Sequence, residues 1–446
     1  MGDVLPTPSS NGSGAPPPST HELLRLRVQE RLRHDGADDL AVHRTGTRDR
    51  GVVTAAIRDV VDDYQREADK GISNAGRLSS PDQTVARLER SLLEAGPLTK
   101  YFTDPERADE VLLLGGVITA IGRDGRLYVD PEPTCEAEMS AITARLLAEA
   151  GATVDLEHTI VVHQIWDNKV RASVSIPPTA EVLDCNFRIY RKQRTTFEDL
   201  VAWGSLTPAA ANACKAFAKG KTRLVAAGEP GSGKSTYMAA HIGATPSTTN
   251  VRISQKYREL TSDQHLGGNW LAGPASKSLR DLTQAQLNFA PGLVVMAECL
   301  GPEAFDLIRA SNSGCAFITS VHSFSATEAM NALPVAAKQA VNDPVEELRR
   351  TFARLIDVVV YCEALPVHLV GDAGRLRQIM EIACVPPQLS DDEFVLEPLF
   401  KREELGAPLE YCGPQALSAE FERRVNRALP KGISLRDLCE GRATLP

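Results

Sequence analysis

The sequence predicts an α/β fold, with a parallel sheet between helices in the second half of the chain and an α+β domain before it. After residue 205, five apolar runs alternate with segments of helical periodicity, a pattern typical of a parallel sheet covered on both faces. Before residue 190 the period changes, and short strand-like runs lie on either side of a hairpin turn signal. At 446 residues, the chain is also long enough for two or more domains.

Composition and periodicity divide the chain into five segments. The first twenty residues are rich in Pro, Ser and Gly and cannot bury enough apolar surface to order themselves. Helical spacing begins near His21, and strand-like runs begin near residue 110. We therefore predict a disordered tail at 1–20, an N-terminal helical region at 21–95, an α+β domain at 96–190, an α/β domain at 191–385 and a C-terminal extension at 386–446.

The α+β domain is predicted from strands, a hairpin turn and one helix. The pair Asp124-Gly125 separates the runs VITAIG and RLYVDP, which is a two-residue hairpin signal. A helix is expected from Glu136 to Ala150, followed by the strands HTIVVHQIW and KVRASVSI.

The α/β domain opens with a well-marked helix and continues as alternating strands and helices. Thr207 is placed to cap a helix that starts at Pro208, the position where proline is best tolerated. The buried strand TRLVAA follows, and four more strand candidates read NVRIS, GLVVMAE, CAFITSVH and DVVVYCEAL. In such a sheet, ligands bind at the carboxyl ends of the strands.

A glycine-rich loop, GEPGSGKST, follows the first of these strands at residues 228–236 and fits G-x-x-x-x-G-K-[ST]. Its glycines let successive N–H groups point into one concavity, and the helix that follows turns its positive end toward the same anion. The lysine supplies charge to the outer phosphates, and the serine hydroxyl suits Mg²⁺. We predict binding of ATP and Mg²⁺ by Gly228, Gly231, Ser232, Gly233, Lys234, Ser235 and Thr236.

Two further strand ends carry groups suited to phosphate chemistry. Glu298 follows the run GLVVMA, where a carboxylate meets both the metal and the attacking water, so we predict a catalytic and metal-binding role for it beside Ser235. The alternative is a surface glutamate that caps the next helix. His322 ends the following strand, where an imidazole can donate to a γ-phosphate, or can be an ordinary satisfied polar residue.

Composition narrows the classes of partner and compartment. A net charge of −9 and an aromatic content of 5% argue against nucleic acid as the main partner. Nine cysteines are scattered without a C-x-x-C pair, which argues against a metal cluster and a disulfide framework. The sequence has neither a run of about eighteen apolar residues nor a charged-then-apolar leader, so we expect a chain that does not span a membrane and is not secreted.

Taken in order, these boxes resemble those of the CpaF-type ATPases of tight-adherence (Flp) pili, within the superfamily of type II and type IV secretion and pilus motors. The loop GEPGSGKST is similar to the family's Walker A box, LVVMAECLGPEAFD to its Walker B box and TSVHS to its histidine box. Upstream, DGRLYV, RASVSIPP and NFRIYRKQRTTFEDLVAWGSLT resemble the end of the N-terminal domain and the linker into the motor domain. The resemblance covers roughly residues 95–400.

This resemblance implies a RecA-like P-loop motor domain in a homo-hexameric ring, with ATP between protomers and each nucleotide between the two domains of one chain. On the same basis, Arg171 and Arg188 match arginines of the N-terminal domain that reach the phosphates. The implied partners are inner-membrane pilus or secretion platform proteins, and the implied location is cytoplasmic, at the periphery of the cytoplasmic membrane.

The chain departs from the family in its acidic residues. Where the aspartate box reads roughly T-I-E-D-x-x-E-L, this chain has RISQKYREL, with Ser254 and Gln255 in place of the acidic pair and Glu259 retained. Leu300 replaces the arginine that follows the Walker B glutamate. Since a lost general base lowers rates by about 10²- to 10⁴-fold, we expect slow hydrolysis with Glu298 acting alone on the water. A glutamate at position 254 is expected to speed turnover at little structural cost.

Three functions remain open from the sequence. The first is a slow ring ATPase that powers pilus assembly or protein secretion. The second is a nucleotide-binding structural or regulatory subunit that has lost turnover. The third, a P-loop kinase or a helicase, needs an acceptor lid or a basic strand channel, and neither is visible in the sequence.

Overall fold

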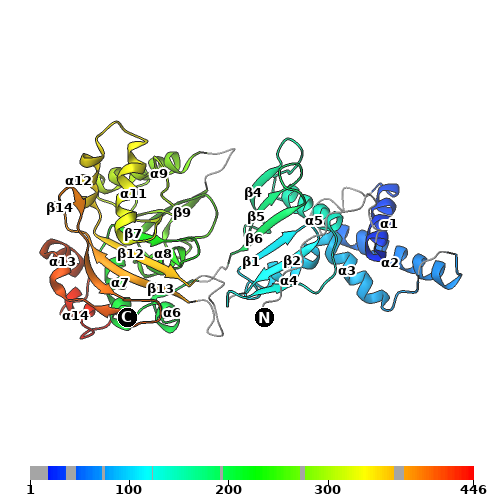
Figure 1. Cartoon of the computed structure of the whole chain (residues 1–446), viewed down its shortest axis with the longest axis horizontal. Coiled ribbons are helices and arrows are strands. Elements are labelled where there is room, and N and C mark those ends of the chain that lie inside the picture. The colour runs from blue at the N-terminus through cyan, green and yellow to red at the C-terminus, as the bar shows by residue number, and fades with distance from the viewer. Residues whose placement is uncertain are drawn as a thin grey trace. The chain divides into compact units, whose positions relative to one another are not determined.

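The computed structural model describes residues 19–36, 47–72, 76–122, 124–190, 194–271, 277–365 and 376–445, which form two compact units (Figure 1). The first unit ends at Ile189, and the second comprises the chain from Tyr190 onward together with the short turn before Leu127. Apart from residues 19 and 20, the predicted tail lies outside the described residues. The other domain limits taken from the sequence stay predictions.

Three helices open the first unit around a small apolar core. They are α1 (Thr20–His34), α2 (Thr47–Asp69) and α3 (Pro81–Leu93). Each presents apolar residues at helical spacing, and packing these stripes together removes them from water. The shared core includes Leu24, Val28, Ile57, Tyr64 and Leu88.

A six-stranded antiparallel sheet completes the first unit, in the order β3-β2-β1-β6-β5-β4. One face packs against the helix α5, whose Met139 and Ile142 join buried strand residues such as Phe187. The turn at Asp124-Gly125 joins β2 to β3 with Gly125 at φ +78°, so the predicted hairpin is confirmed. The elements are β1 (Glu110–Leu114), β2 (Val117–Ile121), β3 (Leu127–Val129), α5 (Glu136–Glu149), β4 (Ile160–Ile165), β5 (Val170–Ser175) and β6 (Asp184–Ile189), after a short 3₁₀ turn (Gly96–Leu98) and α4 (Thr99–Thr103).

The second unit is built on a nine-stranded sheet in the order β17-β16-β13-β12-β7-β11-β10-β8-β9. Six neighbouring strands, β12 to β9 in this order, pair in parallel, and β13, β16 and β17 add antiparallel strands at one edge. The predicted fold class is therefore confirmed. The strands are β7 (Leu224–Gly228), β8 (Asn250–Gln255), β9 (Leu266–Leu271), β10 (Leu293–Met296), β11 (Ala316–His322), β12 (Val358–Ala364), β13 (Arg377–Cys384), β16 (Glu397–Lys401) and β17 (Glu410–Tyr411), with β14 (Leu389–Ser390) and β15 (Glu393–Phe394) in a separate hairpin.

Helices cover both faces of this sheet. Along β7, Leu224 and Ala226 belong to one core cluster while Val225 and Ala227 belong to another, so the strand is buried on both sides. This is why the strands of the parallel half read as continuous apolar runs. The helices are α6 (Phe197–Ala202), α7 (Pro208–Lys219), α8 (Lys234–Ala244), α9 (Leu279–Leu287), α10 (Ala304–Asn312), α11 (Ala326–Lys338), α12 (Val345–Leu355), α13 (Ala419–Asn426) and α14 (Leu435–Cys439).

The helix α7 begins as its sequence predicts. The Thr207 hydroxyl accepts a hydrogen bond from the N–H of Ala210, and Pro208 is the first helical residue. Among the described residues, no helix combines the length and the apolar character needed to cross a membrane.

Candidate nucleotide-binding site

The glycine-rich loop joins the carboxyl end of β7 to the N-terminus of α8. Gly228, Gly231 and Gly233 have φ values of +143°, +78° and +107°, which residues with a Cβ rarely adopt. At Gly228 an added Cβ would also lie 2.2 Å from the carbonyl oxygen of Cys362, so this position requires glycine. The loop therefore has the backbone that a phosphate cradle needs, with the positive end of a helix opening onto it.

The Lys234 side chain lies over this loop rather than in solvent. It is 6% exposed, and its Nζ donates to the carbonyl oxygens of Gly228 and Glu229, both at 2.7 Å. Nζ also lies 3.2 Å from Nδ1 of His322. An ammonium group can only donate hydrogen bonds, so Nδ1 of His322 is the acceptor. In a neutral imidazole, the proton of His322 is therefore on Nε2. The structure thus brings together two predicted site residues from separate strand ends.

The remaining residues predicted in the loop differ in their surroundings. Ser232 is 2% exposed, and its Oγ has no hydrogen-bond partner within the described part of the chain. Ser235 and Thr236 lie in the first turn of α8 and are half-buried. The Ser235 hydroxyl donates to Oε2 of Glu259 at 3.1 Å. Glu259, which the sequence suggested only as a distant reserve, therefore touches the residue predicted to bind Mg²⁺.

Ser254 and Gln255, the two neutral residues at the end of β8, bond other segments than the glycine-rich loop. Ser254 is fully buried, and its hydroxyl donates to Oε1 of Gln286 on α9 at 3.0 Å. Gln286 in turn donates to the carbonyl oxygen of Ile253, also at 3.0 Å. A glutamate at position 254 would place a carboxylate in this closed site, so the expectation of little structural cost is wrong. Its effect on turnover stays a prediction.

Glu298 lies two residues beyond the end of β10 and is half-buried. Its neighbours are fixed to β11, since Cys299 N–H donates to Ser320 O at 2.9 Å and the Ser320 hydroxyl donates to Ala297 O at 2.6 Å. Within the described residues, Glu298 makes no hydrogen bond or ion pair with the glycine-rich loop. Its predicted catalytic and metal-binding role stays a prediction.

The two predicted arginines belong to the first unit. Arg171 on β5 and Arg188 on β6 are paired directly across the sheet, on its half-exposed face. Arg188 forms a long ion pair with Glu110 of β1, at 3.9 Å. The role predicted for these two arginines at a phosphate stays a prediction.

Three buried titratable groups of β12 and α8 are uncharged at neutral pH. Burial raises the pKa of the Cys362 thiol to about 12, although the Lys234 charge opposes the rise. Burial also raises the pKa of Tyr237 on α8 far above its usual range and lowers the pKa of His241 on the same helix to about 4. Charge at the loop therefore comes from Glu229 and Lys234 of the loop itself and from the Glu259 carboxylate that contacts Ser235.

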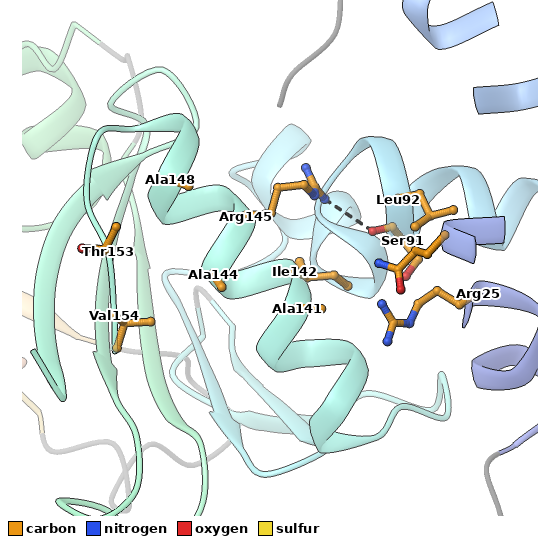
Figure 2. Close-up of a pocket in the computed structure, with 11 residues that line it drawn as sticks. Arg25, Ser91, Leu92, Ala141, Ile142, Ala144, Arg145, Ala148, Thr153 and Val154 are labelled. Atoms are coloured by element: carbon orange, nitrogen blue, oxygen red, sulfur yellow. Dashed lines mark hydrogen bonds between the residues drawn. The ribbon is translucent and has the colours of Figure 1, made fainter. Parts of the chain in front are cut away.

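A cavity of about 360 Å³ lies in the first unit, between α1, α3 and α5 (Figure 2). It contains two arginines, but each is already paired with a carboxylate of its own helix: Arg25 with Glu22 at 2.7 Å and Arg145 with Glu149 at 2.9 Å. Arg145 also donates to the carbonyl oxygen of Ser91 at 3.4 Å, as Figure 2 shows. Lacking the loop and its lysine, this cavity is not the candidate nucleotide site.

Comparison with known proteins agrees with the second unit's geometry. The family model described as "Type II/IV secretion system protein" matches residues 157–362. Residues 157–362 are therefore similar to this family, over somewhat less than half of the chain. The matched segment includes Lys234, Glu298 and His322, and also Arg171 and Arg188 of the first unit.

Individual relatives match a smaller part of the chain. The type IV secretion system protein PtlH of Bordetella pertussis is 34% identical over 171 residues, which are 36% of this chain and 49% of PtlH. VirB11 of Brucella suis is 29% identical over 171 residues, 36% of this chain and 46% of VirB11. The chain therefore spans about half the length of the curated relatives it matches.

Solved structures are more distant. The crystal structure of the VirB11 ATPase of Brucella suis with sulphate aligns at a TM-score of 0.34 and 22% identity, covering 64% of this chain and 94% of VirB11. The pilus retraction motor PilT with bound ADP aligns at a TM-score of 0.49 and 16% identity, covering 66% of this chain and 83% of PilT.

Sequence reasoning missed one functional feature, the role of Gln255. This side chain is 1% exposed and bonds only to the backbone of the loop that carries Glu259. The available signal was the short spacing between Gln255 and Glu259, since a glutamine at a strand end can bond the loop that follows it.

Proposed function

We propose that this chain binds Mg²⁺-ATP at the loop 228–236 and hydrolyses it slowly, as a ring ATPase that powers pilus assembly or type II/IV protein secretion. The observation that carries the proposal is the loop itself, with three glycines at positive φ leading into α8 and Lys234 folded over them. The match of residues 157–362 to the family model described as "Type II/IV secretion system protein" supports the secretion or pilus role.

The residues of the loop divide the work of binding. Backbone N–H groups and Lys234 would hold the phosphates, and Lys234 would exchange its carbonyl partners for phosphate oxygens. Mg²⁺ prefers hard oxygen ligands, and the Ser235 hydroxyl and the Glu259 carboxylate, 3.1 Å apart, fit that preference. When bound, the cation would neutralise phosphate charge. Nε2–H of His322 is suited to donate to the γ-phosphate, and Glu298 would orient or deprotonate the attacking water.

The assembly and the location follow from the resemblance to CpaF-type ATPases. We propose a homo-hexamer in which Arg171 and Arg188 contribute charge to the nucleotide site, at the cytoplasmic face of the inner membrane, with pilus or secretion platform proteins as partners. Sedimentation with and without ATP tests the ring: Arg171→Ala/Arg188→Ala should form fewer hexamers than wild type. An equal hexamer fraction in both proteins would show that these arginines do not contribute to hexamer formation.

A second function is favoured by the neutral residues at the end of β8. Ser254 and Gln255 are buried and carry no charge, so neither can act as a general base. On this second proposal, the chain is a nucleotide-binding structural or regulatory subunit without turnover. Phosphate release by the purified protein separates the two functions, with Lys234→Ala as the background.

Binding is tested by thermal unfolding with and without Mg²⁺-ATP. At about 100 times its dissociation constant, a ligand stabilises the native state by about 2.7 kcal/mol. Wild type should show this stabilisation, and Lys234→Ala should lose most of it, because the variant lacks the charge that meets the phosphates. Lys338→Ala, at an exposed position on α11, is the control and should behave as wild type. An equal shift in Lys234→Ala and wild type would contradict nucleotide binding at this loop.

A further inference from the structure

The side chain of Gln255 makes three hydrogen bonds, all to the backbone of the same short loop. Its Oε1 accepts from the N–H groups of Glu259, at 3.0 Å, and Leu260, at 2.9 Å. Its Nε2 donates to the carbonyl oxygen of Leu260 at 2.9 Å. A carboxylate at position 255 could accept the first two bonds but could not donate the third, so this loop is matched to an amide.

The loop is fixed at both of its ends. Gln255 is 1% exposed at the end of β8, and Leu260 is 2% exposed in the core cluster that also contains residues of β7 and α8. Between them, residues 256–259 are half-buried or exposed. The amide of Gln255 therefore fixes the Glu259–Leu260 end of this segment, where Glu259 N–H also donates to the carbonyl oxygen of Tyr257 at 2.8 Å.

The consequence appears at Glu259. Its N–H is held by Gln255, and its carboxylate accepts the Ser235 hydroxyl at 3.1 Å. One buried neutral side chain thus places a carboxylate at the first turn of α8. Gln255, which replaces an acid of the family's aspartate box, bonds the backbone. Glu259, the acid that remains, contacts Ser235 of the glycine-rich loop.

We propose that Gln255 is a positioning residue that holds the Glu259 carboxylate beside Ser235, so that together these two provide the Mg²⁺-binding oxygens of the site. This inference rests on the proposed function. It makes Gln255 part of the metal dependence of nucleotide binding, although its side chain touches neither metal nor nucleotide.

The test compares three variants of the full chain. Gln255→Met keeps the length of the side chain and removes all three hydrogen bonds, while Glu259→Gln keeps the shape and removes the charge. Gln378→Met is the matched control, because Gln378 is also buried and also bonds two backbone segments, donating to Gly204 O at 2.9 Å and accepting from Gly406 N–H at 2.7 Å.

The first readout is the ratio of the ATP dissociation constants measured by calorimetry in EDTA and in excess Mg²⁺. Residues that support a metal ligand typically change metal affinity by at least tenfold. We expect this ratio to fall about tenfold in Gln255→Met and in Glu259→Gln, with binding in EDTA unchanged, and to stay at the wild-type value in Gln378→Met. The double variant should fall no further than Glu259→Gln alone. A wild-type ratio in Gln255→Met, or additive effects in the double variant, would overturn the inference.

The second readout needs no nucleotide. Amide hydrogen exchange at Glu259 and Leu260 should be faster in Gln255→Met than in wild type, and unchanged in Gln378→Met. Unchanged exchange in Gln255→Met would overturn the positioning role even if ATP binds. If exchange changes as expected but wild type binds no ATP in either buffer, the proposed function fails while the anchoring of the loop stands, and Gln255 loses its role in metal binding.

Discussion

At the end of β7 the candidate site is formed by the conformation of the backbone, whereas at the end of β8 it is formed by hydrogen bonds of side chains. The loop after β7 depends on glycines at positive φ and on a lysine that bonds carbonyl oxygens of its own loop. The end of β8 depends on Ser254 and Gln255, which bond a distant helix and a following loop respectively. The first arrangement is determined by nine consecutive residues, so the sequence predicts it. The second depends on which residues pack against each side chain, which the sequence alone does not show.

The contrast also separates binding from turnover. On the proposed function, binding depends mainly on the β7 side, which supplies the glycine-rich loop and the Lys234 charge. The β8 side supplies one carboxylate, Glu259, beside Ser235. The proposed turnover depends also on Glu298, which follows a third strand, β10, and makes no hydrogen bond or ion pair with the loop within the described residues.

The largest expected effect follows from replacing the catalytic candidate. Glu298→Gln keeps shape and hydrogen bonding but removes the charge, so phosphate release should fall by about 10²- to 10⁴-fold, with ATP affinity unchanged or tighter. Glu303→Gln is the control: Glu303 is a nearby buried glutamate, and its Oε1 accepts from the N–H groups of Leu300 and Gly301, which an amide oxygen can equally do. Turnover that survives in Glu298→Gln would move the chemistry to Glu259.

The next effect tests whether the end of β8 is closed to a second acid. Ser254→Glu should lower the free energy of unfolding by about 3 kcal/mol, because it leaves a carboxylate without a positive partner in a fully buried site. Ser254→Ala, which removes only a hydrogen bond, should cost about 1 kcal/mol. Urea unfolding measures both, and phosphate release should not rise in Ser254→Glu. Faster turnover in that variant would show that the site opens toward the nucleotide.

The sequence predicted local features well because few distant contacts decide them. The glycine-rich loop, the Thr207 cap and the Asp124-Gly125 hairpin are each determined by residues next to one another. The alternation of apolar runs also predicted the parallel sheet, since strands buried on both faces have no polar side.

The elements that were missed depend on partners far along the chain. β6 lies between β1 and β5, and its alternation of Cys185, Phe187 and Ile189 with polar residues was read as part of a linker. β9 has no apolar period and is held by pairing with β8. At Gly267 an added Cβ would lie 1.8 Å from the carbonyl oxygen of Val251 on β8, so only the paired structure explains that glycine.

The site shows the same division. The loop residues were predicted together, and Lys234 and His322 do meet at 3.2 Å. The contact between Glu259 and Ser235 was not predicted, because the Gln255 bonds that shape the intervening loop join a side chain to backbone four and five residues away. Neither the composition nor the hydrophobic period of the strands indicates hydrogen bonds of this kind, from a side chain to a nearby backbone.

The smallest expected effect uses acid to perturb one buried histidine of α8, the helix that follows the glycine-rich loop. His241 on α8 is 1% exposed, and burial lowers its pKa to about 4, against an ordinary value of 6.5. The unfolded chain therefore takes up this proton first as the pH falls, so stability is present above pH 6.5 and is lost between about pH 6.5 and 4. At about 1.4 kcal/mol for each pH unit, the loss from pH 7 to pH 5 is about 2 kcal/mol. Urea unfolding at both pH values should show a pH-dependent loss smaller by this amount in His241→Phe than in wild type. Equal losses in the two proteins would mean that His241 is hydrated or charged in the native state.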